Sequence, residues 1–366
     1  DRPALAALSD GSPAELAPRP LTRPMHYTSG TTGRPKGVTT GLWDEATAAA
    51  VFDDEADQWE FSSEDRHMVC SPMYHTVSVR FAAGTLLRGG SLAILDRFDA
   101  ATALETLRRL RPTTAFLVPT HLHRLLGLPQ LAADERFDSL RLLAHAGAPC
   151  PPVLKQAAMA RVADGVLWEF YGSTEGQFTT CSPDEWLERP GTVGRARPGR
   201  QLQIGPLAGA EGPAEQIGTI WCRVPPFAHF SYWRNPPATA AAWSEDAFTV
   251  GDLGHLDGDG YLYLSGRRDD LIISGGVNVY PAEVEAALAG VAGVEEVAVF
   301  GVPDEAWGER VVAAVVGPAD PDRLRAAAAE RLAPYKRPKE YVRVDQLPHT
   351  ATGKLLRRKL ADQLDR

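Results

Sequence analysis

Residues 27–37 combine hydroxyl side chains, glycines and a lysine in the sequence YTSGTTGRPKG. Glycines let a backbone approach a ligand closely, and successive backbone N–H groups can form a concave anion site. With Lys36 supplying a cation, these residue types suit a polyphosphate. The spacing is not that of a Walker A loop, because Pro35 occupies the place of its second glycine. A flexible surface turn is the alternative interpretation.

A hydroxyl and a carboxylate, Thr174 and Glu175, end the sequence YGSTE, which follows the apolar run 166–170. This run is typical of a strand, so the pair is expected at the strand's carboxyl end, where open α/β sheets bind their ligands. A hydroxyl next to a carboxylate there could ligate Mg²⁺. A local turn stabilised by the same side chains is the alternative.

Three more charged residues lie in glycine-containing segments. Asp252, between Gly251 and Gly254, could accept hydrogen bonds from ribose hydroxyls or could shape a turn. Arg267 could bind a sugar or a phosphate, or it could be a solvated charge. Lys354 ends the loop PHTATGK near the C-terminus, where a solvent-exposed lysine is the simplest interpretation.

Apolar runs that resemble strands alternate with helical patterns from residue 25 to about 264. The expected strands are 66–71, 114–118, 140–144 and 166–170, and the expected helices are 102–110 and about 152–162. This alternation predicts an α/β domain with a mostly parallel sheet. Strands at 201–204 and 218–224 and a hairpin around residues 258–260 predict a β-rich subdomain after it. The last hundred or so residues, with a helix at 281–288, strands at 297–302 and 310–316 and a helix at 321–332, predict a small α+β domain.

Composition excludes several classes of protein. The 366 residues carry 38 Lys and Arg against 47 Asp and Glu, a formal net charge of −9, which argues against a nucleic-acid partner. With 44% hydrophobic residues the chain is globular, and no apolar stretch approaches the ~20 residues of a membrane span. Four widely spaced cysteines favour reduced thiols in the cytoplasm over a disulfide framework or a zinc site.

Taken together, the motifs resemble those of the adenylate-forming superfamily of acyl-CoA synthetases, luciferases and peptide-synthetase adenylation domains. The order of that family is kept: a Thr/Ser/Gly loop with a lysine, an aromatic-Gly-x-Thr-Glu segment, a Gly-Asp segment, a Gly-Arg hinge and a loop ending in Gly-Lys. SPMYH at 71–75 and AGAP at 146–149 also have counterparts there. The resemblance covers residues 25 to 360.

The resemblance implies ATP, Mg²⁺ and coenzyme A as cofactors and co-substrates. The residues implied to hold the β- and γ-phosphates are Thr28, Ser29, Gly30, Thr31, Thr32, Gly33 and Lys36. Those implied at the adenine are Gly147, Ala148 and Pro149, with Tyr171 stacking on it. Gly172, which follows Tyr171, is also implied to bind the cofactor.

The remaining roles concern the reaction itself. By resemblance, Thr174 contacts the α-phosphate, Glu175 binds Mg²⁺, and Asp252 and Arg267 bind the ribose. Lys354 would reach the substrate acid and the α-phosphate, where an ammonium group offsets the charge of two anions brought together. The family needs no covalent enzyme intermediate.

Two residues after the apolar run 66–71 concern the acyl group. His75 matches a position at the acyl pocket of acyl-CoA synthetases, so the resemblance implies a role in thiol access, and a satisfied histidine at a strand end is the alternative. Arg80 lies about one helical turn later, where the family usually has apolar residues. We expect it either to enter the acyl pocket and pair with a second polar group of the substrate, or to form a surface salt bridge.

The resemblance also implies domain movement. Residues 1–268, with 1–24 as a lead-in, would form the large ATP- and acyl-binding domain, and residues 269–366 would form a mobile lid with its hinge at Asp269. Gly275 and Gly276 would let the pantetheine arm of CoA pass. The basic residues Lys336, Arg337 and Lys339 would either meet a CoA phosphate or form a solvated patch.

The expected function is an ATP-dependent acid:CoA ligase that forms an acyl adenylate and transfers the acyl group to CoA. The nucleotide motifs leave other acceptors and acids open: a carrier-protein thiol, an amine, or a small inorganic oxyacid such as nitrite. A non-catalytic nucleotide-binding remnant is a further alternative, which the intact charged motif residues disfavour. The residue types do not select the acid.

The chain departs from the family at its start. Members place roughly 150 or more residues before the Thr/Ser/Gly loop, whereas 27 precede Thr28 here. A separate or missing segment, a shortened member and an oligomer that covers exposed core all remain open. A shortened domain would expose apolar surface, so we predict a homo-oligomer.

Overall fold

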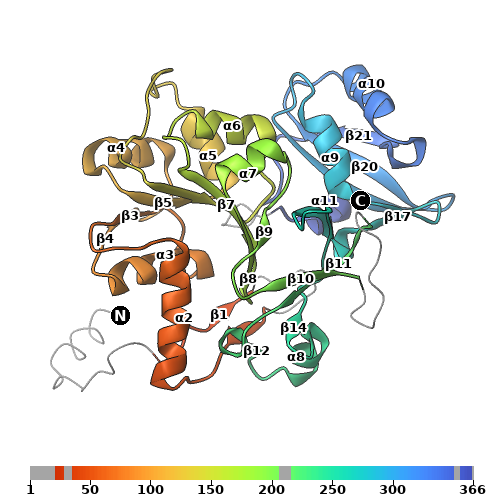
Figure 1. Cartoon of the computed structure of the whole chain (residues 1–366). Coiled ribbons are helices and arrows are strands. Elements are labelled where there is room, and N and C mark those ends of the chain that lie inside the picture. Colours follow the sequence, from red (N-terminus) through yellow and green to blue (C-terminus); the bar gives the residue numbers. More distant parts are fainter. Residues whose placement is uncertain (1–20, 29–34, 206–215, 350–354, 365–366) are drawn as a thin grey trace, which may run out of the picture.

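The structure, a computed structural model, describes residues 21–28, 35–205, 216–349 and 355–364 (Figure 1). The expected phosphate-loop residues 29–33 and the expected catalytic Lys354 lie outside these ranges. None of the helices within them has both the length and the apolar character of a membrane span.

A seven-stranded sheet forms the centre of the large N-terminal part, in the order β4-β3-β5-β6-β7-β8-β9. Its first five strands are parallel, and β8 and β9 are antiparallel additions. The strands are β3 (Arg66–Val69), β4 (Ser91–Ile94), β5 (Thr114–Leu117), β6 (Leu142–His145), β7 (Leu167–Gly172), β8 (Gln177–Cys181) and β9 (Arg195–Ala196). The predicted strand–helix alternation with a mostly parallel sheet is confirmed.

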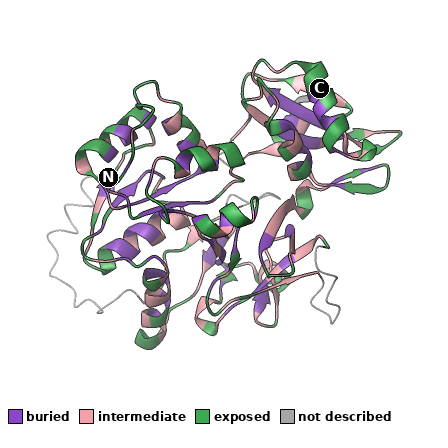
Figure 2. Ribbon diagram, turned by 45° about the horizontal axis from the view of Figure 1, so that its top comes forward, coloured by how far each residue is buried: buried purple, intermediate pink, exposed green. Residues whose placement is uncertain are grey.

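Helices cover both faces of this sheet (Figure 1). On β5, Ala115 and Leu117 face one apolar core while Phe116 faces another, as the two-residue period of a strand requires. Helices α4 (Ala100–Leu110), α5 (Pro119–Leu126) and α6 (Pro152–Met159) contribute to the first core; α2 (Glu45–Gln58) and α3 (Thr76–Leu87) contribute to the second. The central strands are therefore buried between helical layers (Figure 2).

Local capping explains where these helices begin. The Asp44 carboxylate accepts a hydrogen bond from the backbone N–H of Thr47 at 2.7 Å, before α2. Asp99 does the same for Thr102 before α4, at 2.9 Å. Such N-caps satisfy backbone donors that a helix cannot pair internally, each worth about 1 kcal/mol.

A β-rich subdomain follows, as predicted, and it has its own core around Phe178, Phe230 and Phe248. A three-stranded antiparallel sheet, β1-β2-β12, links the start of the chain to this subdomain. Its members are β1 (His26–Tyr27), β2 (Gly37–Thr39) and β12 (Ser231–Tyr232). The neighbouring six-stranded sheet contains β10 (Gln201–Ile204), β11 (Gly218–Arg223), β13 (Trp243–Ser244), β14 (Ala247–Phe248), β15 (Asp252–Leu256) and β16 (Leu262–Arg267). The short helices of this region are α7 (Pro183–Glu188), η1 (Pro226–Ala228) and α8 (Pro236–Ala242).

The C-terminal part is a five-stranded sheet packed with helices, drawn in blue in Figure 1. Its strands are β17 (Ile272–Ser274), β18 (Val277–Val279), β19 (Glu296–Asp304), β20 (Gly308–Val316) and β21 (Glu340–Arg343). Its helices are α9 (Pro281–Ala289), α10 (Pro321–Arg331), η3 (Pro334–Lys336) and α11 (Arg357–Leu364), and η2 (Arg268–Asp270) precedes it. On β20, Val311 and Ala313 face one core and Val312 and Ala314 another. This sheet thus has apolar cores of its own, in agreement with the predicted α+β architecture.

Candidate active site

Three of the sequence motifs meet at the carboxyl ends of parallel strands. His75 follows β3, Gly147 follows β6, and Thr174 and Glu175 follow β7. Gly147 has a φ of +91°, a conformation that favours glycine. Gly147 and Pro149 are exposed and Ala148 is half-buried, which leaves this segment accessible to a ligand.

The segment after β7 is held in a narrow turn. The Ser173 N–H donates to the carbonyl of Gly176 at 2.7 Å, and the Glu175 N–H donates to the Ser173 hydroxyl at 3.2 Å. A Cβ on Gly172 would lie 2.8 Å from the Gly176 carbonyl oxygen, so this position accepts glycine alone. The local turn that we held as an alternative is therefore present, and it presents Thr174 and Glu175 together.

Tyr232 contacts both this turn and Lys36, the lysine of the Thr/Ser/Gly motif. Its hydroxyl donates to the Glu175 carboxylate at 2.7 Å, and the Lys36 Nζ lies 4.5 Å from the centre of its ring. Thr28 and Lys36 pair at the base of the β1–β2 hairpin, where the Thr28 N–H donates to the Lys36 carbonyl at 2.9 Å. Burial and the Glu175 charge raise the pKa of Tyr232, so its hydroxyl stays a donor. Sequence reasoning missed Tyr232, because no motif marks it and 57 residues separate it from Glu175.

A second set of contacts joins Tyr171, Asp252 and Arg267. The Tyr171 hydroxyl donates to the Asp252 carboxylate at 2.6 Å, and the Arg267 Nε lies 3.1 Å from the other carboxylate oxygen. Asp252 and Arg267 are register partners on β15 and β16. Burial and the Asp252 charge raise the pKa of Tyr171. Arg267 is therefore not the isolated solvated charge of our alternative interpretation.

Tyr171 packs its ring in the interior. It stacks on Phe178 with ring centres 4.8 Å apart and is nearly buried. Stacking of Tyr171 on an adenine stays a prediction.

His75 is the residue before α3, and its ring lies 4.5 Å from that of Tyr74. Its buried Nε2 has no hydrogen-bond partner among the described residues, so the satisfied histidine of our alternative interpretation does not describe it. Burial and neighbouring His26 lower its pKa. A neutral imidazole with a spare nitrogen is thus available beside α3.

Arg80 is part of an ion pair that is not at the surface. Its guanidinium lies 2.6 Å from Glu55, and the two side chains are only 13% and 7% exposed. The expected surface salt bridge is therefore wrong in its location. Arg80 lines a cavity that also borders Thr174 and Glu175.

Gly275 and Gly276 form the turn between β17 and β18, with φ of +59° and +76°. The Trp307 ring covers Gly275, whose added Cβ would lie 3.0 Å from it. Among the described contacts, nothing joins this hairpin to the turn after β7. The structure thus brings together Lys36, Thr174, Glu175, Tyr171, Asp252 and Arg267, and it leaves the two glycines apart from them.

Glu175 fits a magnesium ion by its chemistry. A single carboxylate next to the Thr174 hydroxyl offers hard oxygen donors, and the described residues contain no cluster of three or more metal-binding side chains. Mg²⁺ commonly takes one or two protein carboxylates and completes its shell with phosphate oxygens and water. The arrangement therefore suits a metal that arrives with a nucleotide.

Comparison with known proteins agrees with this geometry. Residues 20–232 match the model of the AMP-binding enzyme family, and residues 283–354 match the AMP-binding enzyme C-terminal domain. An uncharacterized acyl-CoA ligase, YhfT, of Bacillus subtilis is 33% identical over 98% of the chain and 73% of its own length. The indoleacetate-CoA ligase of Aromatoleum aromaticum is 36% identical over 90% of the chain, which spans 64% of that relative.

Solved structures give the same result. ATP-bound MatB from Rhodopseudomonas palustris matches with a TM-score of 0.83 and 34% identity, over 93% of this chain and 67% of that one. The amide bond synthetase McbA from Marinactinospora thermotolerans matches with a TM-score of 0.82 and 31% identity, over 93% and 69%. The chain thus spans about two thirds of the length of these proteins. From its motifs, its fold and these matches, the chain belongs to the family of AMP-binding, adenylate-forming enzymes.

Proposed function

We propose that this protein activates a carboxylic acid with ATP, forming an acyl adenylate and pyrophosphate, and then transfers the acyl group to the thiol of CoA. The observation that carries the proposal is the pair of contacts around the turn after β7. Tyr171 and Glu175 each hydrogen-bond a residue of the β-rich subdomain, Asp252 and Tyr232 respectively. The segment that we propose binds phosphate and the carboxylate that we propose binds the ribose would thereby flank one hydroxyl–carboxylate pair.

In the first step an oxygen of the substrate carboxylate attacks the α-phosphorus of ATP. The acyl O–P bond forms, and the bond to the bridging oxygen of pyrophosphate breaks. Thr174 would contact the α-phosphate, Lys36 the outer phosphates, and Lys354 both reacting anions. Mg²⁺ held by Glu175 would neutralise phosphate charge when bound. Asp252 and Arg267 would hold the ribose hydroxyls and so fix the position of the α-phosphate.

In the second step the CoA sulfur attacks the acyl carbonyl, the thiol proton passes to solvent, and AMP leaves as the anion. Exposed aromatic side chains near the Gly275–Gly276 turn support CoA as the acceptor. Trp307 is 41% exposed and Lys339 Nζ lies 4.3 Å from its ring centre, and Tyr335 is 39% exposed. Aromatic faces with cations beside them suit a nucleotide that carries phosphates.

Domain rotation about Asp269 would expose this hairpin to the adenylate. The flanking residues of η2 are tied to opposite sides, since Arg268 bonds Thr219 on β11 and Asp270 pairs with Arg357 on α11. Asp269 lies between these two attachments. This position supports a hinge there, with residues 1–268 and 269–366 as the two domains.

An amine acceptor is the second candidate, and the match to a protein titled an amide bond synthetase favours considering it. Both candidates share the adenylation step.

The cytoplasm is the proposed location, since ATP and CoA are available there and all four cysteines are free thiols. Self-association stays a prediction; the exposed Met25, Tyr27 and Trp233 side chains around Gly37 support it, and light scattering tests it.

The test is incubation with ATP, Mg²⁺ and a panel of acids, with and without CoA, followed by mass spectrometry of AMP, adenylate and thioester. We expect adenylate without CoA and thioester with it. Adenylate that reacts only with an added amine would replace CoA by an amine acceptor. Absence of AMP with every acid would contradict the proposed chemistry.

A further inference from the structure

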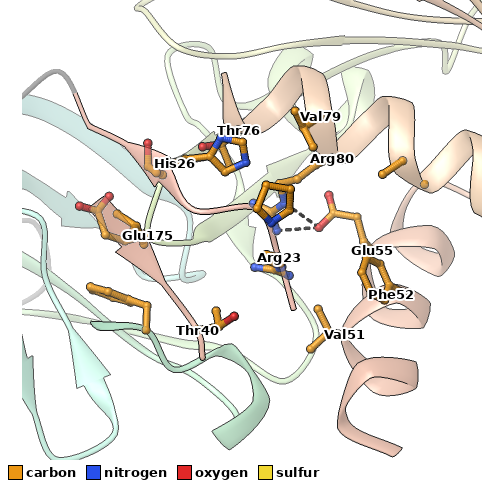
Figure 3. Close-up of a pocket in the computed structure, with 16 residues that line it drawn as sticks. Arg23, His26, Thr40, Val51, Phe52, Glu55, Thr76, Val79, Arg80 and Glu175 are labelled. Carbon is orange, nitrogen blue, oxygen red and sulfur yellow. Dashed lines mark hydrogen bonds and ion pairs between the residues drawn. The ribbon is translucent and has the colours of Figure 1, made fainter. Parts of the chain in front are cut away.

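A small cavity lies between α2, α3 and the segment that precedes β1 (Figure 3). Thr174 and Glu175 form part of its wall, so it opens onto the proposed site of adenylation. Its volume is about 60 Å³, room for a few water molecules or one carboxylate group.

The charged groups of this cavity are unevenly matched. Arg80 and Glu55 form an ion pair at 2.6 Å. Arg23 lines the same cavity, and in the view of Figure 3 it lies between this pair and Glu175. No ion pair or hydrogen bond joins the Arg23 guanidinium to any described residue; its described contact is with the Trp43 ring, at 6.0 Å.

The acidic residues nearby are already used. Asp54, next to Glu55 on α2, pairs with Arg200 at 2.6 Å and with the fully buried Arg197 at 3.2 Å. Counting Arg23 and Arg80, four guanidinium groups face the two carboxylates of Asp54 and Glu55. These groups outnumber the two carboxylates of α2. The third carboxylate at the cavity, Glu175, bonds Tyr232, and Arg23 is the guanidinium that has no ion pair with a described residue.

The walls of the cavity strengthen the electrostatic effect of the Arg23 cation. Apolar side chains of Val51, Phe52 and Val79 line the cavity, and a low-dielectric wall strengthens the field of an unpaired cation. Burial opposes the ionisation of Glu55, yet Arg80, Arg197 and Arg23 more than offset it and hold the pKa of Glu55 at about 2. Burial and the Arg80 charge lower the pKa of Arg23 to about 9. The first effect shows that cations dominate the surroundings of Glu55, whereas the second comes mainly from the burial of Arg23.

Resting on the function proposed above, we propose that Arg23 binds a second carboxylate of the substrate, so that the acid activated here is a short dicarboxylic acid. One carboxyl group would react beside Thr174 and Glu175, while the other would enter the cavity and pair with Arg23. The outer phosphates of ATP are the other anions near Glu175. They share this chemistry, and the experiment distinguishes the two.

The test compares wild type with Arg23→Gln on matched acids, butanoate against succinate and hexanoate against adipate. The measured quantity is the ratio of kcat/KM for the dicarboxylic acid to that for the monocarboxylic acid, from pyrophosphate release at saturating ATP, and the KM of ATP is measured with each acid in a separate titration. We expect wild type to favour a dicarboxylic acid and R23Q to lower the ratio about tenfold or more, as the loss of a charged hydrogen bond implies. The matched control is Arg109→Gln, an exposed arginine of α4 that leaves the ratio unchanged.

Two outcomes overturn the proposal. The first is an unchanged ratio in R23Q. The second is a rise in the KM of ATP in R23Q that is equal for all acids, which would assign Arg23 to the phosphates of ATP. Glu55→Gln provides a second variant in case R23Q does not fold. It removes the competing carboxylate and is expected to raise the ratio, and a fall contradicts the inference.

A binding experiment separates this inference from the proposed function. If no acid releases pyrophosphate, the function fails, and succinate binding then decides the inference by itself. Succinate is expected to raise the melting temperature of wild type in the presence of a non-hydrolysable ATP analogue, with a smaller rise in R23Q. No rise in wild type, or an equal rise in both proteins, overturns the dicarboxylate site.

Discussion

The hydroxyl of Tyr171 donates a hydrogen bond to Asp252 at 2.6 Å, across 81 residues of sequence. Tyr171 is the penultimate residue of β7, the last parallel strand of the central sheet, and Asp252 begins a strand of the β-rich subdomain. The other oxygen of Asp252 lies 3.1 Å from Arg267. The contact therefore fixes the position of the proposed ribose-binding carboxylate relative to the turn that carries Glu175.

Replacement of Tyr171 by phenylalanine removes this hydrogen bond while keeping the stacked ring. We expect Tyr171→Phe to raise the KM of ATP by roughly 5- to 10-fold, because a buried carboxylate loses an orienting donor worth about 1 to 1.5 kcal/mol. Pyrophosphate release at varied ATP measures it. Tyr261→Phe is the control, since its hydroxyl bonds Glu185 elsewhere in the subdomain. An unchanged KM would show that Asp252 does not need Tyr171.

Tyr232 makes a corresponding contact with Glu175, so its effect should appear in the metal dependence. Tyr232→Phe removes the 2.7 Å hydrogen bond that orients the proposed Mg²⁺ ligand. We expect the Mg²⁺ concentration for half-maximal activity to rise about tenfold, in line with the loss of a group that positions a metal ligand. Titration with Mg²⁺ at fixed ATP measures this. Tyr341→Phe, in the C-terminal sheet, should leave the titration unchanged.

The two tyrosines show where sequence reasoning stops. The parallel strands, their helices and the motifs after β6 and β7 could be predicted, because apolar periodicity and glycine-containing turns are local signals. Tyr232 could not be predicted, since its role arises from β12 pairing with β2 and from a contact with a residue 57 positions away. Likewise, the sequence marks Arg80 as unusual, but it does not reveal the buried partner Glu55, 25 residues earlier on α2.

Buried histidines make stability depend on pH. His145 is fully buried at the end of β6, with its Nε2 3.8 Å from Glu169 and with Lys155 nearby, and burial lowers its pKa from 6.5 to about 4. In the unfolded chain His145 takes up a proton near pH 6.5, whereas in the folded chain it does so only near pH 4. The buried neutral histidine therefore costs no stability above pH 6.5, and the free energy of unfolding falls as the pH is lowered from 6.5 towards 4. The loss amounts to about 3 kcal/mol.

Thermal melts between pH 7 and pH 4 test this in wild type, His145→Gln and the exposed-histidine control His123→Gln. We expect the melting temperature of H145Q to fall less steeply with acidification than those of the other two proteins. Parallel curves for all three would assign the acid sensitivity to other groups.

The final prediction concerns the hinge, and it separates the two half-reactions. Proline at position 269 restricts the backbone φ to about −65° and so limits rotation at that residue. Arg268 hydrogen-bonds Thr219, and Asp270 forms an ion pair with Arg357. These two contacts hold the segment on both sides of Asp269. If adenylation and thioester formation use different domain orientations, Asp269→Pro should slow whichever step requires the other orientation by at least about tenfold and spare its partner. Rapid-quench measurement of acyl adenylate formation and of thioester formation from preformed adenylate resolves the two rates, and Asp322→Ala, at the exposed start of α10, is the control in the C-terminal part. Equal slowing of both steps would contradict a hinge at Asp269, because a residue needed only for rotation cannot affect the step that proceeds in the orientation already present.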